Sequence, residues 1–393
     1  MTVISESRIS SVMRAAEALL SHRAGSPVVL ADPEDLGGSG RTTVVRVRVA
    51  QNPLSMGRSL VIKALPEHEN PHAFHREIAS YKYATALPTA SRPGPQLIAS
   101  DANVRLMVLS DLGHGHSMTT LLADGDVVEA TRAVSAWGQA LGRMHAATVG
   151  GEGDFLALVR RGAPDSVRHD ILRDEAARAV REARQRSAAL GVPMPDRVVD
   201  MLEAAQTLFE HGDHRAFSPS DVGPENILLN DDGVQFMDYE WGGFRDATLD
   251  IAYALVTFAS RLGPRGVSRR LDLEVSMVDA WRSEVDSIWP SLRHDREMQQ
   301  KLIAARLLWV WLSTVWMLPA DSADDVSAEP LAGADAGDTM PHGLAHDLAL
   351  HTNDPRRIVS RWADIASAAR GADTPVADFA GATGLALQRT WLA

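Results

Sequence analysis

The sequence predicts an α+β protein with two lobes, a small antiparallel sheet with a helix followed by a larger and mainly helical part. A change of period along the chain is the first reason. Residues 45–49 alternate valines with arginines, which is typical of a half-exposed strand, whereas most of the chain after residue 113 repeats its apolar residues with helical spacing. The second reason is a polar hairpin at residues 226–240, whose Asp-Gly turn interrupts the helical part.

The first lobe is expected to consist of short periodic segments separated by turns. Helical periodicity begins the chain and ends near Gly25, and a glycine cluster then precedes the first strand. Pro71 suits the first turn of a later helix, because proline needs no hydrogen-bond partner there. The expected order is helix 7–22, a strand within 35–50, strand 59–65, helix 71–87, and strands 96–100 and 105–112.

The second lobe is expected to be helical on both sides of the hairpin. Its acidic, small-residue segment 320–339 contains Gly and Pro and predicts a loop, and the pattern beyond residue 369 is weak. The expected helices are 118–125, 127–149, 166–190, 196–212, several segments after residue 250, and 342–369.

Composition excludes several classes of protein. Among 393 residues, 39 Lys and Arg stand against 51 Asp and Glu, and a net charge of −12 disfavours nucleic-acid binding. The absence of cysteine excludes disulfides and thiolate metal sites and suits the cytoplasm. The longest apolar stretch, residues 307–320, is shorter than the roughly 20 residues that cross a bilayer. We therefore expect a soluble, cytoplasmic protein without a membrane span.

Three polar residues around the hairpin suggest phosphoryl transfer. Asp221 and Asn226 lie five positions apart in the loop before it, and Asp238 ends its second strand. A carboxylate can accept the proton of an attacking hydroxyl, while an amide oxygen and a second carboxylate hold Mg²⁺. The alternative is that all three only cap turns.

A lysine and a glutamate of the first lobe strengthen this interpretation. Lys63 lies on the apolar strand VIKAL, where a charge is costly unless it is paired. Glu77 follows fourteen residues later on the next expected helix. A strand lysine paired with a helix glutamate positions nucleotide phosphates in kinases. The alternatives are a lysine that reaches solvent from an edge strand and a glutamate on a solvated helix face.

The sequence resembles the aminoglycoside phosphotransferase/choline kinase group of small-molecule kinases over roughly residues 25–260. The resemblance is carried by VLSDLGHGHSMTTLL, by the W-x-x-A-L-G-x-x-H-A run at 137–146, and by DVGPENILL, FMDYE and DATLDIAYA. It implies a protein-kinase-like bilobal fold with an N-terminal nucleotide-binding lobe (1–109), a hinge (110–113) and a helical C-terminal lobe that carries the catalytic loop and the acceptor site (114–393).

The resemblance also implies a role for each candidate residue. Asp221 corresponds to the catalytic base, Asn226 and Asp238 to the Mg²⁺ ligands, and Lys63 with Glu77 to the phosphate-anchoring pair. The backbone of the hinge residues Ser110–Leu112 would read the adenine edge of ATP or GTP, and Asp250 would tie its helix to the catalytic loop. In the glycine-rich segment 36–41, Ser39 would touch a phosphate, with a plain hairpin turn as the alternative.

Two departures from the family pattern concern the catalytic loop. The usual His-Gly-Asp triplet is replaced by Pro219-Ser220-Asp221. The triplet does occur at His211-Gly212-Asp213, but no hairpin follows it at the right distance, so Asp213 is interpreted as the polar end of the preceding helix.

Two further clusters are better explained by structure than by chemistry. Three histidines at helical spacing lack the cysteines or the HExxH pattern of a zinc site, and three tryptophans in an apolar helix are typical of a core. These are His342, His346 and His351, and Trp309, Trp311 and Trp316.

We therefore expect a small-molecule kinase that transfers the γ-phosphate of ATP or GTP to a hydroxyl group. Eleven residues separate Asp238 from Asp250, too few for the activation segment of a protein kinase. The acceptor candidates are an aminoglycoside, an amino-sugar, and another antibiotic or metabolite, and the acidic charge is compatible with a cationic one. The alternative is a nucleotide-binding pseudokinase or scaffold without turnover.

Overall fold

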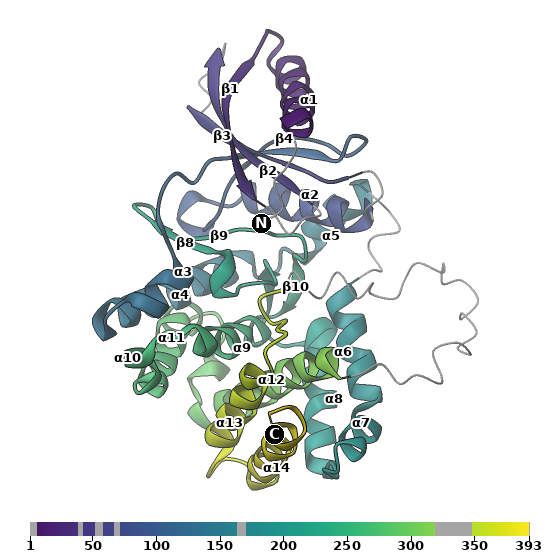
Figure 1. Ribbon diagram of the computed structural model, residues 1–393, viewed down its shortest axis with the longest axis vertical. Coiled ribbons are helices and arrows are strands. Elements are labelled where there is room, and N and C mark those ends of the chain that lie inside the picture. Colours follow the sequence, from purple (N-terminus) through teal and green to yellow (C-terminus); the bar gives the residue numbers. More distant parts are fainter. Residues whose placement is uncertain are drawn as a thin grey trace, which may run out of the picture.

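A five-stranded antiparallel sheet forms the first lobe of the computed structural model, which describes residues 6–37, 42–51, 58–66, 71–162, 170–318 and 348–392. The strands lie in the order β1-β2-β3-β5-β4 (Figure 1). Their bounds are β1 Val29–Gly37, β2 Thr43–Gln51, β3 Ser59–Ala64, β4 Leu97–Asp101 and β5 Leu106–Ser110.

The two faces of this sheet are covered by different helices. Helix α1 (Glu6–Ala24) packs on one face, where Val45 and Val47 of β2 and Ile62 of β3 are fully buried. Successive side chains of a strand point to opposite faces, so Lys63 faces the other side, toward α2 (Pro71–Thr85). The period-two pattern therefore determines which helix Lys63 meets.

The second lobe is mainly helical, with two small sheets next to the first lobe. Strands β6 (His116–Ser117), β8 (Ile227–Asn230) and β9 (Gly233–Phe236) form one sheet, and β7 (Arg215–Ser218) pairs with β10 (Gly243–Asp246). The helices of four or more residues are α3 Met118–Asp124, α4 Val127–Thr148, α5 Glu152–Gly162, α6 Ile171–Arg181, α7 Ala183–Ala189, α8 Asp196–His211, α9 Ala247–Phe258, α10 Pro264–Val267, α11 Arg270–Val285, α12 Asp295–Met317, α13 Pro355–Ala369 and α14 Thr374–Trp391.

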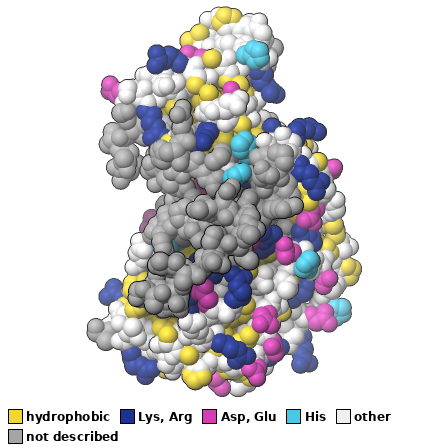
Figure 2. Space-filling view, turned by 90° about the vertical axis from the view of Figure 1, so that its right-hand side faces the viewer, with side chains coloured by type: hydrophobic (Ala, Val, Ile, Leu, Met, Phe, Trp, Pro, Cys, Tyr) yellow, Lys and Arg dark blue, Asp and Glu magenta, His cyan; other side chains and the backbone are white. Residues whose placement is uncertain are grey.

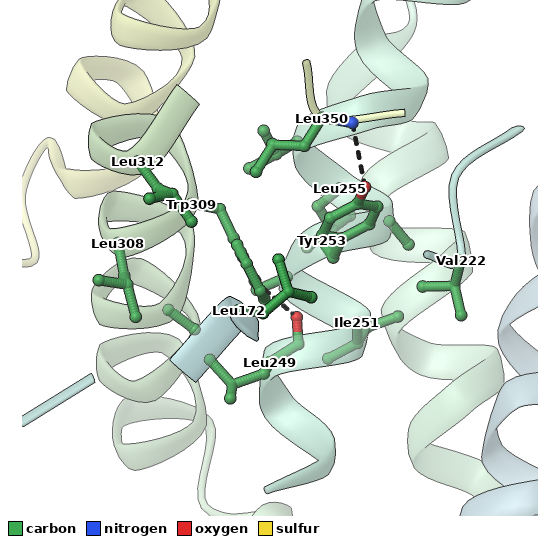
Figure 3. Packing of buried hydrophobic residues seen from close by; sticks show 14 of the residues in the cluster. Leu172, Val222, Leu249, Ile251, Tyr253, Leu255, Leu308, Trp309, Leu312 and Leu350 are labelled. Atoms are coloured by element: carbon green, nitrogen blue, oxygen red, sulfur yellow. Dashed lines mark hydrogen bonds between the residues drawn. The ribbon is translucent and has the colours of Figure 1, made fainter. Parts of the chain in front are cut away.

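Helix α9 is the centre of this lobe, because each of its twelve residues is buried. It packs along α12, where the indole Nε1–H of Trp309 donates a 2.8 Å hydrogen bond to the carbonyl of Leu249 (Figure 3). Trp309 and Trp311 are fully buried, which confirms their expected place in the core. Since α9 follows β10 directly, it is a rigid support for the loops around the hairpin.

The expected fold class is confirmed, and several elements differ from their prediction. Strand β1 was not expected, because its polar residues are mostly exposed at the sheet edge and show no alternation. The short strands β7 and β10 and helix α5 were also missed, and the helix expected at 166–190 is two helices that meet at Glu182. Segment 320–339 lies outside the described residues.

Helix α14 shows how packing overrides a weak sequence pattern. Its glycines lower the intrinsic helix propensity of the segment. Asp373 nevertheless caps its first turn, and Phe379 packs edge-on against Trp362 of α13, with ring centroids 5.8 Å apart.

None of the helices among the described residues has the length and apolarity needed to span a membrane. Figure 2 shows acidic and basic side chains intermingled over the described part of the helical lobe on that face. The net charge of −12 is therefore not gathered into one acidic patch there.

Candidate active site

Lys63 connects three elements that are distant in the sequence. Its ammonium Nζ lies 2.6 Å from Oε1 of Glu77 on α2 and 2.6 Å from Oδ1 of Asp238, just after β9. The side chains of Lys63 and Glu77 are 9% and 2% exposed, whereas that of Asp238 is 39% exposed. The ion pair of Lys63 and Glu77 is thus buried within the first lobe, whereas the carboxylate of Asp238 is partly open to solvent.

Electrostatics keep this lysine charged. Burial disfavours the ammonium form, but the carboxylates of Asp238 and Glu77 outweigh it and raise the pKa of Lys63 well above its usual value. Burial raises the pKa of Glu77, and the nearby carboxylate of Asp238 adds to the rise against the attraction of Lys63. A cation held in this way is suited to bind phosphate oxygens.

Asp238 is held by α2 as well as by the hairpin. Its backbone N–H donates a 3.2 Å hydrogen bond to the hydroxyl of Tyr81, which lies one turn after Glu77 on the same helix. Asp238 adopts a left-handed backbone conformation with φ of 59°, which aspartate tolerates better than most residues. The ring of Tyr81 stacks on Tyr239, with centroids 4.8 Å apart.

Asp221 and Asn226 contact each other directly in the loop before the hairpin. The Asn226 amide Nδ2 donates to Oδ2 of Asp221 at 2.8 Å and to its backbone carbonyl at 3.1 Å. Oδ1 accepts from the Tyr253 hydroxyl at 2.6 Å, and the backbone N–H of Ala349 is 3.1 Å from Oδ2. Burial raises the pKa of Asp221 to about 7, although the bonds from Tyr253 and Ala349 oppose the rise. A pKa near neutrality suits a general base.

The hairpin brings Asn226 next to the carboxylates that follow β9. The N–H of Met237 donates to the carbonyl of Asn226 at 2.8 Å, so Asp238 is only one residue from this contact. Carboxylate oxygens of Glu77, Asp238 and Glu240 lie within 4.8 Å of one another. These hard oxygen donors fit Mg²⁺, which favours carboxylates together with substrate phosphates.

Glu240 is the residue of this cluster that the sequence analysis missed. Its signal was its position only two residues after Asp238, which keeps the two carboxylates close along the chain.

The loop before the hairpin is anchored to the core through Asp250 of α9. The Ser218 hydroxyl donates to Oδ1 of Asp250 at 2.7 Å, and Nε2 of His145 lies 3.1 Å from its Oδ2. The indole of Trp281 donates to Nδ1 of His145 at 2.9 Å, so the proton of the neutral ring is on Nε2 and points at Asp250. This arrangement agrees with the supporting role expected for Asp250.

Ser220 has the left-handed φ of 77° at the position where the family pattern has glycine. Its N–H donates to the hydroxyl of Ser218 at 2.9 Å, and its own hydroxyl donates to the carbonyl of Trp241 at 2.5 Å. These bonds support a conformation that costs most residues about 1–3 kcal/mol.

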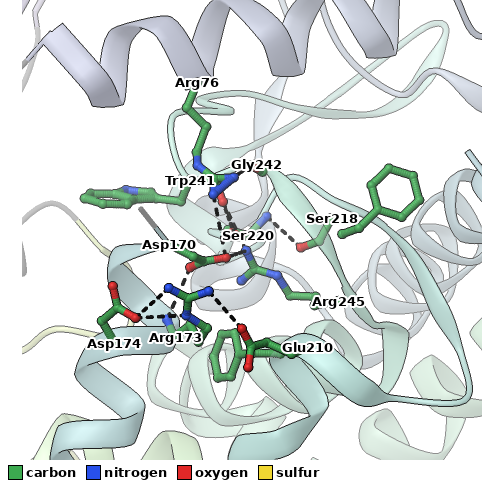
Figure 4. A network of polar contacts seen from close by, with 12 residues as sticks. Arg76, Asp170, Arg173, Asp174, Glu210, Ser218, Ser220, Trp241, Gly242 and Arg245 are labelled. Atoms are coloured by element: carbon green, nitrogen blue, oxygen red, sulfur yellow. Dashed lines mark hydrogen bonds and ion pairs between the residues drawn. The ribbon is translucent and has the colours of Figure 1, made fainter. Parts of the chain in front are cut away.

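Arginines from both lobes surround the segment that follows Glu240 (Figure 4). Arg245 of β10 donates to the carbonyl of Trp241 at 3.1 Å, and Arg76 of α2 donates to that of Gly242 at 3.3 Å. The carboxylate of Asp170 lies 3.8 Å from Arg245 and 4.0 Å from Arg76. Helix α2 thus contacts Lys63 and also the segment that follows the carboxylates of Asp238 and Glu240.

The remaining sequence candidates occupy varied positions. The N–H of Ser110 donates to the carbonyl of Gln96 at 2.9 Å, and the carbonyl of Leu112 accepts from Asn230 at 2.8 Å, so both ends of the hinge are fixed to neighbouring strands. Asp213 is 89% exposed beside Lys301, away from the cluster, as expected for the end of a helix. Ser39, His342 and His346 lie outside the described residues.

Comparison with known proteins gives one family match. The profile of the phosphotransferase enzyme family matches residues 36–283. No curated protein sequence matches the chain.

Solved structures resemble the chain at low sequence identity. A choline/ethanolamine kinase family protein from Mesorhizobium loti is 15% identical, with 97% of this chain and 99% of that chain covered and a TM-score of 0.46. Amicoumacin kinase hAmiN, in complex with AMP-PNP, Ca²⁺ and Ami, is 12% identical, with coverages of 81% and 92% and a TM-score of 0.45. Aminoglycoside 2′-phosphotransferase-IIIa, in its GDP complex, is 12% identical, with coverages of 77% and 99% and a TM-score of 0.38.

Proposed function

Because the chain belongs to the phosphotransferase enzyme family, we propose that it transfers the γ-phosphate of ATP or GTP to a hydroxyl group of a small molecule, with Asp221 as the base. The observation that carries this proposal is the double ion pair of Lys63 with Glu77 and Asp238. It joins the sheet, α2 and the hairpin. The proposal is further supported by the backbone bond from Met237, the residue before Asp238, to Asn226, whose amide in turn binds Asp221.

In this proposal the first lobe holds the donor nucleotide. Lys63, oriented by Glu77, binds the α- and β-phosphates, as the equivalent ion pair does in kinases. The backbone of Ser110–Leu112 reads the adenine edge, and Ser39 touches a phosphate. The triphosphate competes with Asp238 for the lysine, so binding would release this carboxylate for other partners.

Asn226 and Asp238, with Glu240 next to them, are the residues that would hold Mg²⁺. The ion, when bound, neutralises charge on the β- and γ-phosphate oxygens. Asp221 orients the acceptor hydroxyl and accepts its proton as the oxygen attacks the γ-phosphorus and the bond to the nucleoside diphosphate breaks.

The experiment that tests this function is a nucleotide-consumption screen with Mg²⁺ and either ATP or GTP. The acceptors are aminoglycosides, amino-sugars, sugars, amino alcohols and cyclic peptides, and Asp221→Asn is the matched variant. We expect consumption that depends on one acceptor class and falls by orders of magnitude in the variant, with nearly unchanged nucleotide affinity. Equal acceptor-dependent consumption by both proteins would contradict the role of Asp221, whereas no consumption by wild type with any acceptor would favour the nucleotide-binding scaffold.

A further inference from the structure

Residues Leu348–Leu350, which we name the strap, pass over the catalytic loop from the C-terminal part of the chain. The backbone N–H of Ala349 is 3.1 Å from Oδ2 and 3.3 Å from Oδ1 of Asp221. Gly223 of the loop allows this approach, because a Cβ at that position would collide with the Cβ of Ala349. Leu348 and Leu350 are buried, so the strap is packed in place on both sides of the contact.

Tyr253 of α9 lies between the strap and the carboxylate. Its hydroxyl accepts a 3.0 Å hydrogen bond from the N–H of Leu350 (Figure 3). Its own proton is therefore free to point at Oδ1 of Asp221, 2.6 Å away. Its buried ring meets the edge of Trp309 at a centroid distance of 5.1 Å. The hydroxyl is therefore held by both its ring packing and its hydrogen bonds.

Arg361 of α13 holds the strap from the opposite side. Its guanidinium Nη1 donates a 2.6 Å hydrogen bond to the carbonyl of Leu350, and Arg361 is only 3% exposed. The contacts thus form a continuous path from α13 through the strap and Tyr253 to Asp221. The strap and α13 lie beyond residue 283, where the family match ends.

These contacts determine the orientation of the carboxylate. Asn226 and Tyr253 each donate one hydrogen bond to it, and the Ala349 N–H lies 3.1 Å from Oδ2 and 3.3 Å from Oδ1. The terminal torsion of an aspartate is otherwise broad, so three donors from fixed elements select one plane. An ionised carboxylate has about four acceptor positions, so a further donor can take the one that the longer Ala349 contact to Oδ1 occupies.

We propose that Tyr253, supported by the strap, is a positioning residue that orients Asp221 so that the acceptor position now taken by the longer Ala349 contact receives the proton of the acceptor hydroxyl. This inference rests on the proposed function, since it assigns Tyr253 a role through the base. A misplaced base lowers kcat but leaves nucleotide affinity unchanged, because only the transition state requires the base to be aligned with the acceptor hydroxyl.

The opposite possibility is that the strap takes the place of the acceptor. Asp221 is 3% exposed, and the Ala349 N–H donates to it as a substrate hydroxyl would. The two roles predict effects of opposite sign when the contact is removed, so one variant of the strap separates them.

The principal variant is Tyr253→Phe, which removes the hydroxyl and keeps the ring. Its matched control is Thr257→Val, one turn later on α9, whose buried hydroxyl bonds only to backbone carbonyls of the same helix. With Mg²⁺ and ATP or GTP, whichever wild type consumes, we expect kcat of Tyr253→Phe to fall ~10–100-fold with the nucleotide KM within ~2-fold. The control should retain wild-type kcat. Equal kcat for the two variants would overturn the proposal.

Ala349→Pro removes the N–H of the strap without changing any side chain that touches Asp221. We expect a fall in kcat of roughly tenfold, with nucleotide affinity measured by calorimetry unchanged. A rise in kcat would show that the strap blocks the acceptor position and would overturn the positioning role. If wild type turns over no faster than Asp221→Asn, the proposed function itself fails, and that result is visible before the Tyr253 variants are compared.

Discussion

Lys63 and Asp238 are separated by 175 residues in the chain, and their side chains are joined by a 2.6 Å ion pair. This pair directly connects the sheet of the first lobe with the end of the hairpin of the second. Since Asp238 is much more exposed than Glu77, the lysine has one permanent partner within its own lobe and one that solvent or a ligand can reach. The same ammonium group therefore stabilises the fold and, in the proposed function, also binds the nucleotide.

Removal of Lys63 should destabilise the fold unless Glu77 is neutralised at the same time. Lys63→Met leaves a buried carboxylate without its cation, and breaking such a pair costs about 3–5 kcal/mol. Lys63→Met with Glu77→Gln should recover part of that loss, because no unpaired charge then remains in the apolar site. Chemical denaturation of both single variants and the double variant gives the coupling free energy. Strictly additive losses would mean that the two side chains act independently.

Asp238→Asn should weaken the binding of nucleotide only when Mg²⁺ is present. The amide keeps one oxygen ligand but loses the negative charge that favours a hard divalent cation. Calorimetric titrations of ATP with and without Mg²⁺ measure the difference. Asp213→Asn, at an exposed carboxylate of the same lobe, is the control and should match wild type in both titrations. The same affinity loss in the absence of Mg²⁺ would remove Asp238 from the metal site.

Ser220 allows a separate test of backbone strain in the loop before the hairpin. Ser220→Ala keeps the left-handed φ and loses the bond to the Trp241 carbonyl, whereas Ser220→Gly loses the bond but relieves the strain. A net hydrogen bond contributes ~0.5–1.5 kcal/mol, and a left-handed residue costs ~1–2 kcal/mol. We therefore expect the glycine variant to be more stable than the alanine variant by ~1–2 kcal/mol in thermal or chemical unfolding. An alanine variant as stable as the glycine variant would show that the loop relaxes.

Sequence patterns predicted the parts of the site whose signals are local or at regular spacing. The apolar run around Lys63 marked it as a charge that needs a partner, and the Asp-Gly turn placed Asp221, Asn226 and Asp238 around one hairpin. The structure brings these residues together with Glu77, while their chemical roles stay predictions.

The contacts that orient Asp221 had no such signal. Tyr253 lies 32 residues from Asp221 and Ala349 lies 128 residues from it, and only tertiary packing brings them to the carboxylate. In the sequence, Tyr253 cannot be distinguished from the other apolar residues of a buried helix. Strands β7 and β10 were missed for a related reason, because four-residue strands whose partner is distant in the chain show too little alternation to be distinguished from loops.

The raised pKa of Asp364 in α13, outside the candidate site, predicts that the stability of the fold depends on pH. Burial raises its pKa to about 6, although Arg270, 3.2 Å away, opposes the rise. The folded protein therefore holds this proton at pH values where the unfolded chain, with a pKa near 3.8, has lost it. Protonation stabilises the fold, so this contribution is fully present below pH ~4 and is lost as the pH rises toward 6.

Asp364→Asn removes that titration, so the difference in unfolding free energy between wild type and the variant isolates it. Wild type should lose stability relative to the variant between pH ~4 and ~6, by up to about 3 kcal/mol for a shift of two pKa units. Urea denaturation of both proteins across this range measures the difference, in which all other carboxylates cancel. A difference that does not change with pH would mean that the ion pair with Arg270 fully compensates for the burial of Asp364.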